Sequence, residues 1–514
     1  MTNPTIASPT LLVRQPTVSQ EHLAFLYAGD LWVANRDGSH PQRLTVQPGV
    51  KQRPSFSPDG QWVAYSAGNL EAGYSVYVIS VNGGSPTQLT FHPGHDWVQG
   101  WTPDGEQILF SSARDAVTQR ITRFFTVPRT GGFPTALPLP MAARGAYAPD
   151  GKRIAYAAIP EPFNTWKRYR GGQTSPIWLF DCESHEIEEI PHVNASDAYP
   201  CWLGATVYFL SDRNHTMNVF AYDTQSKSVR QVTRHEDFDV RSVATGGGVV
   251  VYEQAGRIHL LDPVTGASQP VPIQIVADLP QTRPHYKKAN GYIRDAALSP
   301  NGARAVFEVR GEILTVPAKK GDVRNLTRTP DVHERFPAWS PDGKRIAYFS
   351  DAQGEYQLVL RDQAGLAEPE FIDLQDKTFF YSPKWSPDGQ KILYTDKRLN
   401  LFYLDLNAAE CKPLLVDTDS YDHPDRTLDP VWSPDSQWIA YTKRLANHLR
   451  ALFLYDLATA TSHQVTDGMS DAISATFSLD GKYLFFAAST NYGLNTGWLD
   501  MSSYHRPVDR SLYV

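Results

Sequence analysis

The sequence has few cysteines, no long apolar run and no surplus of basic residues, and each absence excludes a class of protein. Its three cysteines are Cys182, Cys201 and Cys411. They are odd in number, widely separated and without metal-ligand spacing, which argues against a disulfide framework and favours a reducing compartment. The formal net charge is −7. A nucleic-acid-binding protein needs a basic face, so we expect no nucleic acid partner.

The sequence also lacks signals for a membrane or for export. No stretch approaches the ~20 consecutive apolar residues that a membrane-spanning helix needs, so we expect no membrane partner. Residues 1–18 have no basic start followed by an apolar core, so no secretory signal is visible. We therefore expect a cytoplasmic protein. The alternative is a periplasmic protein whose signal peptide has been removed.

The short motifs of hydrolases and metalloenzymes are absent as well. Gly-x-Ser-x-Gly does not occur, and the nearest fragment, Gly-Met-Ser-Asp at 468–471, lacks the second glycine. His-Glu-x-x-His does not occur, and residues 235–239 carry one imidazole. An acidic group at 417–425 lacks the ordered spacing of a calcium loop. We expect no catalytic residue, no metal and no cofactor in this chain, so that it is itself inactive.

What the sequence does contain is a repeated turn, in which an aromatic residue precedes Ser or Thr, Pro, Asp and Gly, and an apolar strand follows. The aspartates of the seven clearest copies are Asp59, Asp104, Asp150, Asp342, Asp388, Asp435 and Asp480. Within each half of the chain, neighbouring copies are 45 to 47 residues apart. A period of ~40–50 residues with strands on both sides of a turn is typical of β-propeller blades.

The chemistry of the repeat supports this interpretation. Proline presets φ at the second position of a type I turn, aspartate tolerates the third, and glycine adopts the left-handed conformation from which an antiparallel strand leaves. The strand at 344–349 is rich in β-branched and aromatic residues, and residues 354–360 alternate as in a half-buried strand. We expect the aromatic residue before each turn to pack between blades, as part of the core.

The repeats divide the chain into two arrays. Six units occupy residues 16–271, a proline-containing connector covers 270–284, and five further units run from 297 to the end. We therefore predict an all-β fold of tandem β-propellers, with a six-bladed propeller over residues 1–280 and a second over 281–514. Radial closure hides sheet edges in a propeller. Because the second array stops after about five blades, we expect a fragment of a longer protein.

Several segments resemble the N-terminal part of Tricorn-type serine peptidases, in particular the bacterial Tricorn-like branch. They are Tyr-Ala-Gly-Asp-Leu-Trp at 27–32, Gly-Trp-Thr-Pro-Asp-Gly at 100–105, Gly-Gly-Phe-Pro-Thr at 131–135, Trp-Lys-Arg-Tyr-Arg-Gly-Gly at 166–172, Tyr-Phe-Leu-Ser-Asp-Arg at 208–213 and Trp-Leu-Asp-Met at 498–501. Many TolB-like propellers share the repeated turn, whereas the segment at 166–172 is much more specific. The resemblance covers essentially the whole chain.

The resemblance implies a six-bladed propeller followed by a seven-bladed one, of which about five blades are present. In the family, a PDZ-like module and an α/β catalytic core with a serine nucleophile and a histidine base then follow. That region is missing here, so no catalytic residue can be transferred. The chain would be the non-catalytic, substrate-gating and scaffold region of a Tricorn-like serine peptidase that degrades oligopeptides.

The implied partners are peptide substrates, the protein's own C-terminal PDZ-like and catalytic domains, and further copies in a homo-oligomer. On this interpretation each ring encloses an axial channel that passes extended chains and excludes folded domains. An alternative from another class is a stand-alone TolB-like propeller that acts as a protein-interaction scaffold. A stop codon directly after Val514 would favour that alternative.

One loop is a candidate for a role beyond folding. It holds three cations interleaved with two aromatic residues: Trp166, Lys167, Arg168, Tyr169 and Arg170. Such a loop could grip a peptide carboxylate or contact a neighbouring subunit. In the alternative, the aromatic rings are buried in the blade while the cationic side chains extend into solvent.

Overall fold

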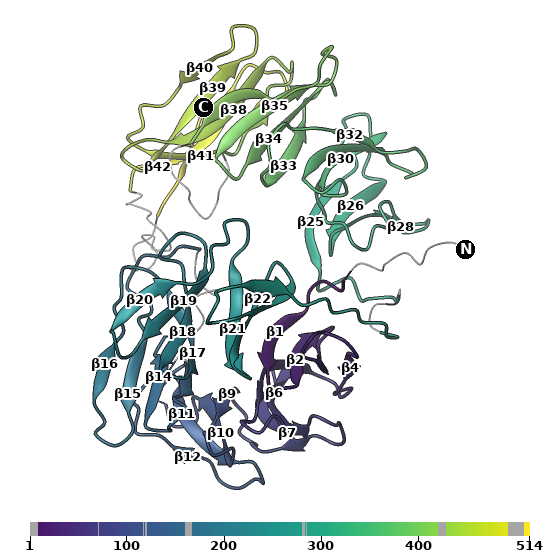
Figure 1. Cartoon of the computed structure of the whole chain (residues 1–514). Coiled ribbons are helices and arrows are strands. Elements are labelled where there is room, and N and C mark those ends of the chain that lie inside the picture. Colours follow the sequence, from purple (N-terminus) through teal and green to yellow (C-terminus); the bar gives the residue numbers. More distant parts are fainter. Residues whose placement is uncertain are drawn as a thin grey trace. The chain divides into compact units, whose positions relative to one another are not determined.

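The computed structural model describes residues 9–69, 71–116, 118, 121–159, 167–279, 283, 285–419, 428–491 and 508–514. The chain divides into two compact units, Met1–Arg283 and Pro284–Val514. Within the described ranges every regular element is a β-strand (Figure 1). This part of the chain therefore contains no apolar helix long enough to cross a bilayer.

The described residues of the first unit form six four-stranded antiparallel sheets, and the strands follow chain order within each sheet. From the first sheet to the sixth, the strands are β1 (Arg14–Val18), β2 (His22–Tyr27), β3 (Asp30–Asn35) and β4 (Gln42–Arg43); β5 (Val50–Phe56), β6 (Trp62–Asn69), β7 (Gly73–Ser80) and β8 (Thr87–Gln88); β9 (Asp96–Trp101), β10 (Gln107–Ser112), β11 (Arg123–Pro128) and β12 (Thr135–Ala136); β13 (Arg144–Tyr147), β14 (Arg153–Ala157), β15 (Trp178–Asp181) and β16 (Ile187–Glu189); β17 (Asp197–Leu203), β18 (Thr206–Ser211), β19 (Asn218–Asp223) and β20 (Ser228–Gln231); β21 (Val240–Gly246), β22 (Val249–Gln254), β23 (Arg257–Leu261) and β24 (Ser268–Pro270).

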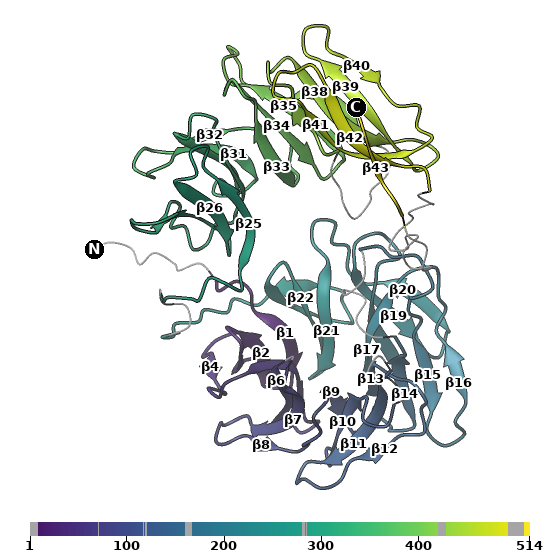
Figure 2. The ribbon, with the colours of Figure 1, turned by 180° about the vertical axis from the view of Figure 1, so that it is seen from behind.

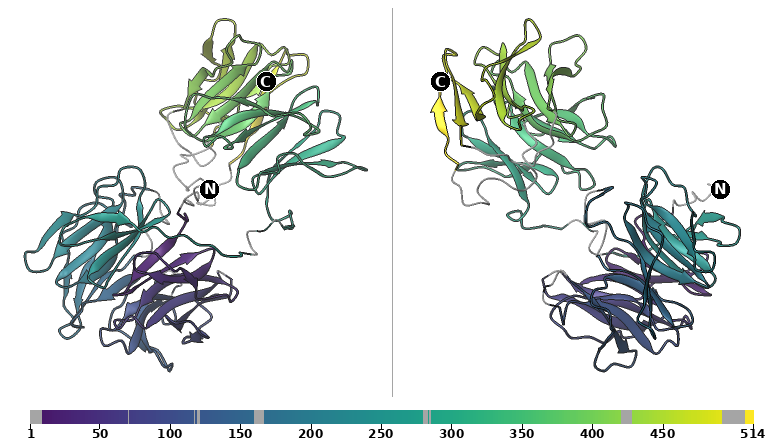
Figure 3. Two further views of the ribbon diagram at one scale, coloured as in Figure 1. Left: turned by 45° about the vertical axis from the view of Figure 1, so that its right-hand side comes forward. Right: turned by 90° about the vertical axis from the view of Figure 1, so that its left-hand side faces the viewer.

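The six sheets of the first unit close into a ring. The first strands of successive sheets (β1, β5, β9, β13, β17 and β21) pack against one another in turn, and β21 packs back against β1. A buried cluster joins the first and sixth sheets, with Phe25 and Trp32 on one side and Val251 and Ile258 on the other. The amide of Thr10 also donates to the Ile273 carbonyl at 2.8 Å. Figure 3 shows these sheets from two further sides.

The second unit repeats the same blade. Its described residues form four four-stranded sheets and one three-stranded sheet, again in chain order (Figure 2). The strands are β25 (Ile293–Leu298), β26 (Arg304–Val309), β27 (Glu312–Pro317) and β28 (Arg324–Asn325); β29 (Glu334–Trp339), β30 (Arg345–Ser350), β31 (Gln357–Asp362) and β32 (Glu370–Ile372); β33 (Phe380–Trp385), β34 (Lys391–Asp396), β35 (Asn400–Asp405) and β36 (Leu414–Thr418); β37 (Val431–Trp432), β38 (Trp438–Arg444), β39 (Arg450–Asp456) and β40 (Thr461–Gln464); β41 (Asp471–Phe477), β42 (Leu484–Ser489) and β43 (Ser511–Tyr513). The predicted all-β tandem propeller fold is confirmed.

The repeated turn links the first and second strands of a blade. At the turn after β5, the amide of Gly60 donates to the Ser57 carbonyl at 2.9 Å, and Gly60 has φ +70°. The amide of Trp62 donates to the Ser57 hydroxyl at 3.0 Å. Hydrogen bonds from Ser57 and from the amide of Gln61 hold the pKa of Asp59 below its ordinary value. Ser57, Asp59 and Gly60 therefore each make a specific hydrogen bond that holds the turn.

The aromatic residue before the turn lies between blades, as predicted. Trp101 and Trp339 are buried, and each indole N–H donates to a backbone carbonyl of the preceding blade: Trp101 to Ser55 at 3.0 Å and Trp339 to Ala297 at 3.3 Å. A buried indole N–H needs such an acceptor. The tryptophan therefore both fills the space between two sheets and fixes their relative position.

Candidate functional site

The first ring surrounds a cavity of about 470 Å³ on its axis. All six innermost strands contribute to its lining, from β1 through β5, β9, β13 and β17 to β21. The wall is thus made of strand backbone held by sheet hydrogen bonds. The sheet hydrogen bonds of six blades therefore fix the backbone that surrounds the cavity.

Bulges in the innermost strands shape this cavity. In β1, β5 and β17 the pairing register shifts at an X-Pro pair, and the residue before the proline has a positive φ: 47° at Gln15, 55° at Arg53 and 54° at Tyr199. All three residues and the prolines after them line the cavity. Proline has no amide to donate, so it fits at a bulge where the ladder is interrupted.

Side chains at these bulges connect one blade to the next. The amide of Arg53 donates to Oε1 of Gln15 at 2.7 Å, and the amide of Gly145 donates to Oε1 of Gln99 at 3.4 Å. The amide of Gln15 in turn donates to Oε2 of Glu253 at 2.8 Å. The lining is therefore fixed by hydrogen bonds across blades as well as within them.

The lining combines cationic, polar and apolar groups. Among the described residues that line the cavity, Arg53 and Arg144 carry charge. The Arg144 guanidinium lies 4.2 Å from the centroid of the Tyr199 ring and donates to the Tyr199 hydroxyl at 3.0 Å. The Arg53 guanidinium lies 4.8 Å from the centroid of the Trp97 ring. Donors of this kind suit the carbonyl and carboxylate groups of an extended peptide.

The loop predicted to contact a peptide or a subunit follows β14. Trp166 lies outside the described residues. Nζ of Lys167 lies 3.0 Å from Oδ2 of Asp239, which directly precedes β21 in the sixth blade. Nη1 of Arg170 lies 2.8 Å from Oδ2 of Asp212, which directly follows β18 in the fifth blade. Two of the three cationic side chains therefore pair with carboxylates of other blades, Lys167 with the sixth blade and Arg170 with the fifth.

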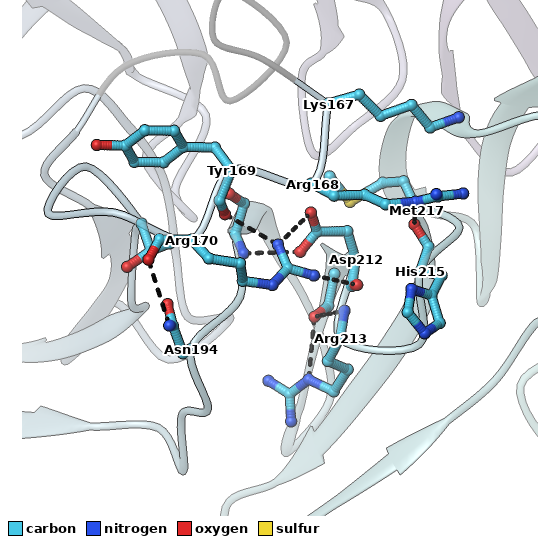
Figure 4. Close-up of polar contacts among 12 residues, drawn as sticks. Lys167, Arg168, Tyr169, Arg170, Asn194, Asp212, Arg213, His215 and Met217 are labelled. Carbon is cyan, nitrogen blue, oxygen red and sulfur yellow. Dashed lines mark hydrogen bonds and ion pairs between the residues drawn. The ribbon is translucent and has the colours of Figure 1, made fainter. Parts of the chain in front are cut away.

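Asp212 is the centre of this contact (Figure 4). Nη2 of Arg170 donates to the Asp212 carbonyl at 3.0 Å, and the amide of Ser196 donates to Oδ1 of Asp212 at 2.8 Å. Nε of Arg168 donates to the carbonyl of His215 at 3.3 Å. These contacts join the fourth blade to the fifth. The predicted contact of Lys167, Arg168, Tyr169 and Arg170 with a peptide or subunit stays a prediction.

Among the residues that the structure describes, no three His, Cys, Asp or Glu side chains gather as metal ligands. Burial raises the pKa of the Cys201 thiol to about 12, so it is protonated at neutral pH. Residues 420–427, which include most of the acidic group noted in the sequence, lie outside the described part.

Sequence reasoning missed the bulge residues, although a signal was present. Arg53, Tyr199, Phe336, Ser382 and Asp429 each begin the pattern X-Pro-x-aromatic, which ends at the aromatic residue before the turn. All five have a positive φ. At the first four of these residues the pairing register of the innermost strand also shifts, so the pattern is a sequence signal that accompanies the bulge.

Comparisons with known proteins agree with this architecture. Residues 10–267 match the family described as "Tricorn protease N-terminal beta propeller domain", and residues 293–492 match "Tricorn protease second beta propeller domain". The putative tricorn protease homolog 2 of Streptomyces coelicolor is 30% identical over 355 residues, which cover 67% of this chain and 30% of that protein. The tricorn protease homolog of Saccharolobus solfataricus is 25% identical over 355 residues, covering 68% of this chain and 32% of its own length.

A solved structure shows the same fold. The crystal structure of the tricorn protease superposes with a TM-score of 0.64 at 19% sequence identity and covers 93% of this chain and 47% of that one. The chain spans about a third of the length of the curated relatives it matches.

Proposed function

The chain belongs to the Tricorn protease family, and we propose that it is the substrate-gating and scaffold region of a Tricorn-like serine peptidase that degrades oligopeptides. The observation that carries the proposal is the closed ring of six blades around an axial cavity of about 470 Å³. A cavity of this size accepts an extended chain and is far too small for a folded domain. The ring thereby acts as a size filter.

The rigidity of the wall supports this role. A filter must keep its width when a peptide enters, and the bulged strands are tied across blades by contacts such as the one from Arg53 to Gln15. The arginines of the lining are held against aromatic rings, which limits the entropy they lose on binding. A peptide can then bind weakly at successive positions along the axis, which allows it to pass through the ring.

Hydrolysis is assigned to a part of the protein that these residues do not include. In the proposal, peptides that pass the propeller reach a PDZ-like and a serine-containing catalytic domain of the same protein. The protein works as a cytoplasmic homo-oligomer, so that the propeller is the route to an enclosed active site. Residues 1–514 alone then bind peptides without cleaving them.

The test compares two polypeptides, residues 1–514 and the product of the gene read to its natural stop codon. Both are assayed with fluorogenic oligopeptides, with and without a serine-directed inhibitor. We expect inhibitor-sensitive hydrolysis from the longer product only. Cleavage by residues 1–514, or a stop codon directly after residue 514, would contradict the proposal, and the latter would favour the protein-interaction scaffold.

A further inference from the structure

Corresponding residues of the six innermost strands line the axial cavity of the first ring. Each stands three residues before the position of the aromatic residue that precedes the turn, a position held by Val18 in the first blade and by Thr245 in the sixth. We call this set the axial layer. From the first blade to the sixth, its members are Gln15, Arg53, Val98, Arg144, Tyr199 and Ser242.

The charges of the axial layer are all of one sign. Arg53 and Arg144 are its charged members, and no aspartate or glutamate occurs among the described residues that line the cavity. The chain as a whole carries a formal net charge of −7, so the two arginines are a local exception and not part of a generally basic surface. A cavity that is walled by protein and lined by one sign of charge concentrates groups of the opposite sign.

The blade architecture does not require a cation at this position. In the second unit, the corresponding residues of the first four blades are Asp295, Phe336, Ser382 and Asp429. Phe336 and Ser382 have a positive φ and lie at a register shift, as Arg53 does. The position therefore accepts acidic, aromatic and small polar side chains, and the bulge alone does not explain the two arginines of the first ring.

Each guanidinium is held against an aromatic ring of the following blade. Arg53 of the second blade lies over Trp97 of the third, and Arg144 of the fourth blade lies over Tyr199 of the fifth. Both arginines are half-buried and line the cavity. A guanidinium carries five N–H donors in one plane, so a group that stacks on a ring can still present an edge to a carboxylate. The stacking thus orients both cations before a ligand arrives.

Glu253 is an acid that contacts the axial layer without lining the cavity. It belongs to β22, the second strand of its blade, and is buried. Its Oε2 accepts hydrogen bonds from the amide of Gln15 at 2.8 Å and from the Ser242 hydroxyl at 3.2 Å. Oε1 of Gln15 accepts in turn from the amide of Arg53 at 2.7 Å. These bonds fix the neutral members of the layer beside the arginines.

We propose that the axial layer is a subsite for the side-chain carboxylate of an acidic residue, an aspartate or glutamate of an extended peptide. The inference rests on the proposed function, because the cavity must admit peptides. The carboxylate meets the edges of the Arg53 and Arg144 guanidinium groups, which bind carboxylates more strongly than neutral acceptors. A lysine or arginine of the peptide meets like charge there and is disfavoured. The first propeller then sorts peptides by charge as well as by width.

The first test measures binding of a blocked tripeptide, acetyl-Ala-Glu-Ala-amide, to residues 1–514 by calorimetry at pH 8 and ~20 mM salt, where screening is weak. The matched control peptide carries glutamine, which has the shape of glutamate without its charge. A third peptide, acetyl-Ala-Ala-Ala with a free C-terminal carboxylate, separates a terminal carboxylate from one on a side chain. We expect the glutamate peptide to bind at least about tenfold more tightly than either of the others, a difference of ~1.4 kcal/mol.

The other outcomes separate this proposal from the proposed function. Equal binding of the glutamate and glutamine peptides would overturn selection by charge and leave admission of peptides intact. Binding of the third peptide as tight as that of the glutamate peptide would overturn the assignment to a side chain. If none of the peptides binds, the subsite is overturned, while hydrolysis by the full gene product still tests the proposed function.

Variants of the two arginines locate the site. Arg53→Gln and Arg144→Gln each remove one charge and keep an amide donor. We expect each to lower the preference for the glutamate over the glutamine peptide, and the double variant to abolish it. Arg234→Gln, which removes an exposed arginine of the first unit outside the cavity lining, is the control and should bind as the parent does. An unchanged preference in both single variants, each with the melting temperature of the parent, would contradict the assignment.

Discussion

At the scale of one residue, Glu334 is a buried acid in a blade that lacks the arginine found beside the corresponding acids of two other blades. The blade keeps the buried acid, and the alanine at 352 leaves it without the cation that Asp96 and Asp197 have. Burial, and to a smaller extent the carboxylates of Glu312 and Asp351, raise its pKa to about 7. An acid whose pKa is raised by folding stabilises the folded state fully below its unfolded pKa, and this contribution is lost as the pH rises through the folded pKa.

Glu334→Gln should therefore change how the stability of the second unit depends on pH. The native protein should lose on the order of 2–3 kcal/mol of unfolding free energy between pH 4.5 and pH 8 through this group. The glutamine variant should not show that loss. Urea unfolding of both proteins at several pH values measures the difference, and parallel profiles would show that Glu334 does not titrate as described.

His259 gives the opposite dependence in the first unit. Burial, the neighbouring His235 and Arg257 lower its pKa to about 4, and its ring stacks on Tyr252 with centroids 4.9 Å apart. A base with a lowered pKa stabilises the fold fully above its unfolded pKa of about 6.5, and that stability is lost as the pH falls towards 4.

His259→Phe keeps an aromatic ring on Tyr252 and cannot be protonated. Its unfolding free energy should fall less between pH 6.5 and pH 4.5, by ~2 kcal/mol, than that of the native protein. Urea titrations followed by tryptophan fluorescence measure this. The same acid sensitivity in both proteins would exclude His259 as its source.

At the scale of the element, the repeated turn combines local hydrogen bonds with contacts between blades. In the second blade of the second unit, the amide of Arg345 donates to the Ser340 hydroxyl at 2.9 Å, and Ser340 is buried. In the third blade of the first unit, Thr102 takes the place of this serine and accepts from Gln107 at 3.0 Å. Threonine is thus compatible with the turn.

Ser340→Ala should lower the unfolding free energy by ~1–2 kcal/mol, because the amide of Arg345 loses the acceptor that the buried Ser340 provides. It should also raise the pKa of Asp342, which the Ser340 hydroxyl lowers. Ser340→Thr is the matched control and should cost much less. Equal losses of unfolding free energy in the two variants would mean that the side-chain hydroxyl at position 340 does not stabilise the turn.

The loop after β14 makes a different kind of contact, over long sequence distances. Arg170 reaches Asp212, whose side chain is 7% exposed. Removing the arginine leaves a largely buried carboxylate without its cation. We expect Arg170→Met to cost ~1–3 kcal/mol, and Asp212→Asn to cost less when Arg170 is already replaced. A double-mutant cycle measures this coupling, and additive losses would contradict the pair.

The strands and turns could be predicted from the sequence, but the contacts between side chains far apart in the chain could not. The turn at Asp59 and the packing of Trp101 follow from local chemistry and from a short period, so both could be predicted. The partners of Lys167 and Arg170 could not, because Asp239 and Asp212 lie 72 and 42 residues away and ring closure brings them near. The bulges at Arg53 and Tyr199 were missed because their role depends on pairing between strands.

At the scale of the whole molecule, the axial cavity depends on closure of the first ring. Because β21 packs against β1, the six sheets form one closed ring with an axial cavity. Each sheet then packs against a neighbouring sheet on both of its faces. The strain of a positive φ before proline is repeated in several blades of both units. Strain of this kind persists only where the surrounding structure enforces it, and here it places side chains at the axis.

Gly100 is a position at which a larger side chain would block this cavity directly. It lies in β9, lines the cavity, and a Cβ atom built on it meets no other atom within 4 Å. Gly100→Trp should therefore obstruct the axis without displacing the wall. Gly291 is exposed, and its Cβ atom would also meet nothing within 4 Å, so Gly291→Trp is the matched control.

The decisive measurement is hydrolysis of an extended oligopeptide by the full gene product carrying either substitution. If the axis of the first propeller is a route for peptides, Gly100→Trp lowers the rate by about tenfold or more, equivalent to ~1.4 kcal/mol, while Gly291→Trp leaves it unchanged. Equal rates for the native protein and the Gly100→Trp variant, with the fold intact by circular dichroism, would contradict the account.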